Sequence, residues 1–149
     1  MPDFLETTVD KFIFKVATDR YYTDEGVWAQ VQGKRVRIGL SDFLQQRSGD
    51  VAFAEVKPEG TQVARGDEIA VIETIKVNIS LSSPVKGTVV KVNPAMEAAP
   101  ESINQDPYGE GWLAEMEVDD WDTDRTRLLD PQAYFTMMKA EAEDEVKKE

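Results

Sequence analysis

Short segments in which apolar and polar residues alternate, separated by turns at close intervals, are the feature that most constrains this chain. Val27 to Leu40 alternates on both sides of Gln32-Gly33, which predicts a β-hairpin in which the glycine supplies a positive φ. The same short, strand-like character recurs in segments 12–16, 51–56, 69–73, 77–82, 88–93 and 112–118. A series of short strands buries a core by stacking in two layers, so the sequence predicts a mainly β fold, a β-sandwich or flattened barrel.

Helices are expected only at the periphery. Ser41-Asp42 can cap a short helix that Gly49 would end. Asp130-Pro131 is a favourable pair of N-cap and first helical residue, which predicts a helix near the C-terminus. Residues 94–111 are rich in Pro, Glu and Ala and are predicted to form a loop.

A chain of 149 residues fits one domain of ordinary size. Within residues 1–149 we expect an N-terminal strand or extension over 1–19 and the β-sandwich over 20–118. Residues 119–125, DDWDTDR, are predicted to be an acidic connector, and 130–149 a C-terminal helix that ends in a frayed acidic tail from residue 141.

Composition excludes several function classes. The chain has no histidine and no cysteine, which removes imidazole bases, thiol nucleophiles and most transition-metal sites, so no metal site is expected. A net charge of −12 without a basic cluster argues against nucleic-acid binding and favours docking to basic partners. No apolar stretch is long enough to span a bilayer, and no secretory signal is visible, so a cytoplasmic protein is expected.

The segment IETIKVNIS, residues 72–80, places Lys76 at the tip of a predicted hairpin, three residues after Glu73. Gly66 lies ten residues before this lysine and Gly87 eleven residues after it, each beside a turn. The segments before and after Lys76 are therefore similar, each with a turn and a strand. Lys76 is expected at the end of the hairpin opposite to these turns. An exposed amine at a hairpin tip is accessible to a modifying enzyme.

GDEIAVIETIK (66–76) followed by SPVKG (83–87) resembles the hairpin to which lipoate is attached in lipoyl domains. The likeness extends to INQDPYGEGWL (103–113), VWAQVQGKRVRIGLSDF (27–43) and LLDPQAYFTMM (128–138). Over roughly residues 20–138 the chain resembles the glycine cleavage H-protein family. The resemblance implies a lipoyl-type β-sandwich, of the hammerhead kind shared with biotinyl carriers, with short peripheral helices and a C-terminal helix.

The resemblance implies that a lipoate-protein ligase attaches lipoate to the ε-amine of Lys76. Glu73 would serve recognition by that ligase, and Gly66 and Gly87 would meet the backbone demands of the hairpin. Biotin is the weaker alternative, because biotin carriers usually flank their lysine with methionines. On this interpretation the protein is a non-catalytic carrier, expected to be a monomer, whose lipoyl-lysine arm swings between partner enzymes.

The residues expected near the arm depart from the family pattern. In H proteins the resemblance implies polar residues that hold a charged amine: a His-Glu pair before the tryptophan of the first hairpin, a helical histidine, and an aspartate after the lipoyl lysine. The corresponding residues here are Gly26, Val27, Phe43 and Ser80. A buried cation without a partner is costly, so these residues oppose an aminomethyl cargo.

This departure favours the H-like lipoate-binding proteins of sulfur oxidation, whose partner is a heterodisulfide-reductase-like complex. The alternative is the glycine cleavage carrier, with glycine decarboxylase, aminomethyltransferase and dihydrolipoyl dehydrogenase as partners. A third class, an unmodified binding module that has kept only the fold, also remains open.

Overall fold

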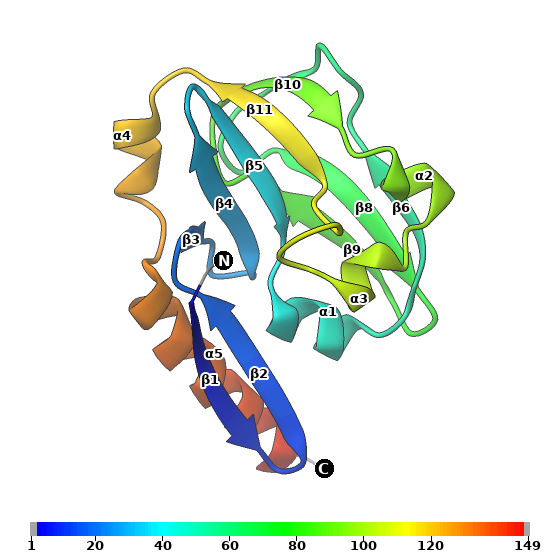
Figure 1. Ribbon diagram of the computed structural model, residues 1–149, viewed down its shortest axis with the longest axis vertical. Helices are drawn as coiled ribbons and strands as arrows, with labels where there is room; N and C mark the ends of the chain where they lie inside the picture. The colour runs from blue at the N-terminus through cyan, green and yellow to red at the C-terminus, as the bar shows by residue number, and fades with distance from the viewer. Residues whose placement is uncertain (1–2, 148–149) are drawn as a thin grey trace.

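The structure is a computed structural model that describes residues 3–147. Its centre is an antiparallel β-sandwich of two sheets (Figure 1). The larger sheet has the strand order β3 (Tyr21–Tyr22), β4 (Val27–Gln32), β5 (Arg35–Leu40), β11 (Ala114–Val118), β10 (Gly87–Val92) and β7 (Gln62–Val63). The smaller sheet has the order β6 (Val51–Val56), β8 (Glu68–Thr74) and β9 (Asn78–Ser82).

The core between these sheets is apolar and draws on both of them. Ile38 of β5 and Met116 of β11 are buried in the same cluster as Ile72 of β8 and Leu81 of β9. The alternation read from the sequence is the cause, because every second residue of a strand points to the same face. The sheets are not closed on themselves, so the lipoyl-type β-sandwich is confirmed and the flattened barrel is not formed.

A hairpin of β1 (Phe4–Val9) and β2 (Phe12–Ala17) lies apart from the sandwich and packs on α5 (Pro131–Lys147) (Figure 1). Its turn contains Asp10 with a φ of 57°. Apolar residues of this hairpin and of α5 form a second buried cluster with Tyr22, Trp28 and Phe43. The strand expected over 12–16 is confirmed, whereas its partner β1 was not predicted.

Helix α1 (Asp42–Ser48) connects the two sheets and follows the prediction closely. The Ser41 hydroxyl accepts a hydrogen bond from the Leu44 amide at 3.2 Å, as an N-cap should. Gly49, with a φ of 93°, ends the helix, because a side chain is strained in that backbone conformation.

Two sequence predictions are wrong in the same direction, because together they miss three short helices. The predicted loop over 94–111 contains α2 (Ala95–Ala98) and α3 (Ser102–Gln105), and the predicted acidic connector contains α4 (Trp121–Arg125). Asp120 caps α4 by accepting from the Thr123 amide at 3.2 Å. These helices have at most five residues, too few to show a periodic apolar pattern.

The predicted frayed tail is helical as far as the structure describes it. α5 continues to Lys147, because Ala142 is buried and Val146 packs against the second cluster. Glu145 of this last part also forms an ion pair with Arg47 at 2.9 Å. Residues 148 and 149 of the predicted tail lie outside the described residues.

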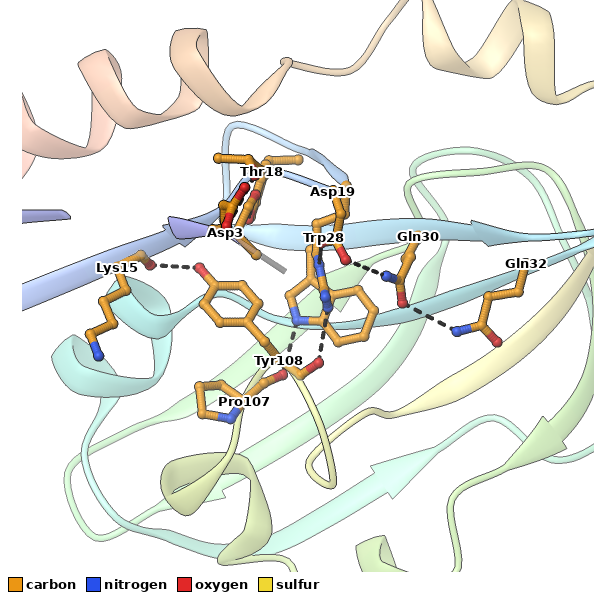
Figure 2. A network of polar contacts seen from close by, with 12 residues as sticks. Asp3, Lys15, Thr18, Asp19, Trp28, Gln30, Gln32, Pro107 and Tyr108 are labelled. Carbon is orange, nitrogen blue, oxygen red and sulfur yellow. Dashed lines mark hydrogen bonds and ion pairs between the residues drawn. The ribbon is translucent and has the colours of Figure 1, made fainter. Parts of the chain in front are cut away.

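A polar clasp joins the loop at 106–111 to the first strands (Figure 2). The Trp28 indole N–H donates to the backbone oxygens of Leu40 at 2.9 Å and Pro107 at 3.0 Å. The Tyr108 hydroxyl donates to the Lys15 carbonyl at 2.7 Å, and the buried guanidinium of Arg20 lies 4.5 Å from the Trp28 ring. Burial raises the pKa of Tyr108 to about 12, so its hydroxyl remains a donor at neutral pH.

Candidate functional site

The turn between β8 and β9 presents three residues, Ile75, Lys76 and Val77, beyond the last paired residues of the hairpin. Glu73 and Asn78 are the final pair of the register, and the Thr74 amide donates to the Val77 carbonyl at 2.8 Å. All three tip residues are exposed, with Ile75 at 75%. The hairpin tip predicted from the sequence is therefore present, with the lysine at its centre.

The Thr74 hydroxyl fixes the conformation of this turn. Its oxygen accepts hydrogen bonds from the Lys76 and Val77 amides at 3.1 and 3.0 Å, and lies 2.6 Å from the Ser48 carbonyl oxygen, to which it donates. The Ile75 amide also donates to the Asp50 carbonyl at 3.0 Å. The tip is thus fastened to the chain that leaves α1, so Lys76 is presented from a fixed position.

The side chain of Lys76 extends over the C-terminal end of α1. Its Nζ donates to the Arg47 carbonyl at 3.3 Å, one of the carbonyls that a helix end leaves without an intrahelical partner. The negative end of the helix dipole favours a cation there. An amide formed on this nitrogen would keep one N–H, so acylation of the lysine is compatible with the same hydrogen bond.

Beside Lys76 lies a cavity of about 450 Å³, partly open to solvent. It is bounded by the β1–β2 hairpin, by α1 and by the end of α5, and Lys76 forms part of its rim. Its lining is Val9, Phe12, Phe14, Phe43, Gln46, Arg47, Lys76, Ala142, Glu145 and Val146. A partly open hollow lined by both apolar and charged or polar side chains has room for a small molecule.

The charges at the edge of this cavity are largely paired. Arg47 lies 2.9 Å from Glu145 and 3.6 Å from Glu141, and its guanidinium lies 5.5 Å from the centre of the Phe43 ring. Because these side chains are partly exposed, the pairs contribute little to stability. Arg47, the cation that α1 contributes to the lining of this cavity, is therefore paired with carboxylates of α5.

The predicted hairpin residues occupy both ends of the hairpin. Glu73 is exposed near the tip, opposite Phe53 of β6. Gly66 (φ 93°) and Gly87 lie at the far end, where the Gly66 amide donates to the Ser83 carbonyl at 2.9 Å. Gly87 is approached closely by the Glu117 carbonyl oxygen, which leaves no room for a side chain.

Of the four residues predicted near the arm, the structure places only Phe43 in the cavity beside Lys76. Gly26 and Val27 are buried, and a side chain on Gly26 would meet the Tyr134 hydroxyl. Ser80 is exposed on β9 and donates to Glu68 at 2.6 Å. The structure therefore does not bring these four residues together, and their predicted common role remains a prediction.

Sequence reasoning missed the residues that surround the lysine. Thr74 carried a signal, because a threonine two residues before the lysine can fold a turn through its hydroxyl. No signal in the sequence marked the other residues, because their position near Lys76 depends on contacts between distant segments. These residues are Phe12, Phe14, Arg47 and Val146.

Residues 3–147 offer neither a carboxylate cluster that could hold a metal ion nor a helix that could span a membrane. No group of three or more Asp and Glu side chains in this part of the chain is arranged to hold a metal ion. No helix within the same range has the length and apolar character needed to cross a membrane.

Comparison with known proteins gives a consistent result. Residues 20–141 match the family model described as glycine cleavage H-protein. The glycine cleavage system H protein of Thermus thermophilus is 39% identical over 127 residues, 85% of this chain and 98% of that protein. A probable glycine cleavage system H protein of Natronomonas pharaonis is 44% identical over 106 residues, 71% of this chain and 84% of that protein.

A solved structure agrees with these sequences. The crystal structure of a glycine cleavage system H protein from Mycobacterium marinum superimposes with a TM-score of 0.70 at 29% identity, covering 80% of this chain and 95% of that one. Glycine cleavage H proteins are non-catalytic carriers with lipoate covalently attached to a lysine. The chain therefore belongs to the glycine cleavage H-protein family and is a lipoyl carrier rather than an enzyme.

Proposed function

We propose that lipoate is attached to Lys76 and that the protein is the carrier of a glycine cleavage system, located in the cytoplasm. The observation that carries the attachment site is the exposed Lys76 at the centre of a three-residue tip fixed by Thr74. The glycine cleavage assignment is supported by the names of the relatives and by the extent of the match over residues 20–141.

The chain's own residues would present the arm rather than perform chemistry. A lipoate-protein ligase would recognise the tip through the exposed Glu73 and through the exposed apolar side chains of Ile75 and Val77. Glycine decarboxylase, aminomethyltransferase and dihydrolipoyl dehydrogenase would then be visited in turn. A tether raises the local concentration of the bound group at each of these partners.

The attachment site is tested by the intact mass of protein produced in a host that makes lipoate. We expect the mass increase of one lipoyl group in the parent protein and in Lys86→Arg, a control at another surface lysine. Lys76→Arg should show no increase, although it keeps the positive charge. A lipoyl mass on Lys76→Arg would contradict the assignment.

A second candidate function is supported by the cavity beside Lys76. Its lining includes Phe43 where the family pattern has a histidine, so one polar partner for an aminomethyl group is absent there. This observation favours a lipoyl carrier in sulfur oxidation, acting with a heterodisulfide-reductase-like complex. The relatives compared above bear glycine cleavage names, which favours the first candidate.

The two candidates differ in the cargo that the lipoylated protein accepts. We offer it, with the lipoyl ring in the oxidised disulfide form, to glycine decarboxylase with glycine and follow the mass of the loaded carrier. The electron pair released on decarboxylation opens the disulfide, so that one sulfur takes the aminomethyl group and the other becomes a thiol. Loading at a rate comparable to that of a glycine cleavage H protein supports the first candidate. Absence of loading, with a H protein loaded in parallel, supports the second.

A further inference from the structure

The outer face of the smaller sheet, formed by β6, β8 and β9 (Figure 1), continues into the hairpin tip. Phe53 of β6, Glu73 of β8 and Asn78 of β9 lie side by side across its three strands. Glu73 and Asn78 are the last pair before the turn that carries Lys76. Because Lys76 follows Glu73 by three residues, the backbone of Phe53 lies roughly 10 Å from that of the lysine.

The ring of Phe53 faces solvent. It is 66% exposed, and the tip residues Ile75 and Val77 are 75% and 44% exposed. The pairing of β6 with β8 shifts register between Val51 and Phe53, and a β-bulge of this kind re-aims a side chain. Apolar side chains held in water at defined positions gain free energy when a partner covers them. Phe53 and the two tip residues are therefore suited to protein–protein contact.

We infer that Phe53 is a docking residue for the enzyme that acylates Lys76, and that an apolar hollow with a basic rim on that enzyme receives its ring. The inference rests on the proposed attachment of lipoate to Lys76, and it adds a residue of a neighbouring strand to the recognition surface. In the step itself, the Nζ ammonium loses two protons and forms one amide bond to the acyl carbon. The activating group leaves that carbon with the electron pair of its bond.

The size of an ordinary protein–protein interface supports this occupant. Such a contact buries about 800 Å² on each partner, which corresponds to a disc of roughly 16 Å radius. An enzyme that centres a contact of this size on Lys76 covers the ring of Phe53 as well. Enzymes that act on the dithiolane ring meet it at the free end of the arm, so their contact need not include Phe53.

The charges of this face favour a basic partner over a second copy of the chain. Lys57, which follows β6, already lies 3.7 Å from Glu68. The two rows of outward-facing residues nearest the tip contain acids and no base, and they consist of Phe53, Glu55, Val71, Glu73, Asn78 and Ser80. Two copies would oppose like charges around the apolar centre, whereas a basic rim on a different protein would complement them.

The test is the steady-state kinetics of a lipoate-protein ligase, with the unlipoylated protein as the varied substrate. We expect Phe53→Ser to raise KM for the carrier roughly tenfold and to leave kcat unchanged, because it removes binding without altering the amine. Phe53→Tyr keeps the ring and should keep the KM of the parent. Phe4→Ser is the matched control, since the Phe4 ring is 42% exposed on β1, and both constants should stay unchanged.

A second measurement identifies the occupant. The reduced, lipoylated Phe53→Ser protein should be reoxidised by dihydrolipoyl dehydrogenase with the KM of the parent, because that enzyme acts on the ring of the arm. An equal rise of KM with both enzymes would assign Phe53 to partners in general and would overturn the inference. So would a dimer of the parent in sedimentation that Phe53→Ser does not form, since it would assign this face to a second copy.

The outcomes separate the docking residue from the attachment. A parent protein that gains no lipoyl mass contradicts the proposed attachment and the docking role together. A parent lipoylated at Lys76, with an unchanged KM for Phe53→Ser, contradicts the docking role alone. A lower kcat at unchanged KM would mean that Phe53 positions the lysine instead of binding the enzyme, and it would also overturn the inference.

Discussion

Thr74 decides how firmly Lys76 is presented, because one hydroxyl serves two amides of the turn and one carbonyl of α1. The side chain therefore links the local conformation of the tip to the helix beside it. The lysine is the reactive residue, but its threonine neighbour fixes its place.

Replacing Thr74 by valine keeps the shape of the side chain and removes these hydrogen bonds. We expect the free energy of unfolding to fall by about 1–3 kcal/mol, since amides and a carbonyl lose a partner. We also expect slower lipoylation by the ligase, because the tip becomes mobile. Urea denaturation and a timed mass assay measure the two effects, and Thr74→Ser, which keeps the hydroxyl, should behave as the parent. Equal lipoylation rates for the Thr74→Val and Thr74→Ser variants would contradict the proposal that the hydroxyl fixes the tip.

Glu115 supplies a pH-dependent contribution to stability within the larger sheet. The hydrogen bond from Arg37, 2.8 Å long, holds the pKa of its carboxyl below the ordinary value of 4.5. A carboxyl with a lowered pKa in the folded state stabilises the fold above its unfolded pKa, and this contribution is lost as the pH falls through the folded value.

Glu115→Gln should therefore lower the free energy of unfolding by roughly 1–2 kcal/mol at pH 7, where a charged hydrogen bond becomes a neutral one. The difference from the parent protein should shrink as the pH is lowered below 4.5. Denaturant titrations over this range measure it. Glu117→Gln, an exposed residue of the same strand, is the control and should change stability little. If the difference in free energy of unfolding between the two proteins grew as the pH fell, the lowered pKa of Glu115 would be contradicted.

At the scale of elements, the end of α1 and the tip of the β8–β9 hairpin act as one unit. Gly49 ends α1 with a positive φ, and a Cβ on it would lie 3.1 Å from Cδ of Lys76. The helix end therefore determines both where the chain turns and where the lysine side chain runs.

Gly49→Ala should lower the free energy of unfolding by about 1–3 kcal/mol through backbone strain. It should also displace the Lys76 side chain and change the rate of lipoylation. Gly66→Ala is the matched control, since its φ is also 93° but no atom lies within 4 Å of a Cβ placed there. We expect Gly66→Ala to lose stability with an unchanged lipoylation rate. Equal rates in both variants would show that the helix end does not position the lysine.

For the whole molecule, the dominant property is the net charge of −12. Complementary charge accelerates the association of a carrier with its partners. Salt screens this attraction, with a Debye length of about 10 Å at 0.1 M. Such attraction raises the rate of association more than it prolongs the lifetime of the complex. This suits a carrier that must leave each partner.

We expect the second-order rate constant for reoxidation of the reduced, lipoylated protein by dihydrolipoyl dehydrogenase to fall several-fold between 20 mM and 300 mM salt. Stopped-flow measurements under pseudo-first-order conditions give this rate constant. Free dihydrolipoamide, which lacks the acidic protein, is the control and should show a much weaker dependence. The same salt dependence for both substrates would exclude electrostatic steering by this surface.

The sequence by itself determined the features that depend on near neighbours. Alternation identified most strands, Gly33 marked the turn of the first hairpin, and Ser41 and Gly49 marked the ends of α1. Lys76 was placed at a hairpin tip for the same reason, because a turn and its flanking strands are encoded within a dozen residues. The short helices α2, α3 and α4 were missed, since so few residues show no period.

Only the tertiary structure decided what surrounds the lysine. Phe12 and Phe14 reach the cavity because the β1–β2 hairpin packs on α5, and α5 stays helical to Lys147 because the same packing buries Ala142. Phe43 joined Lys76 there, whereas Gly26, Val27 and Ser80 did not. The physical reason is that contacts between distant segments depend on how whole faces fit together, and local patterns of residues do not specify that fit.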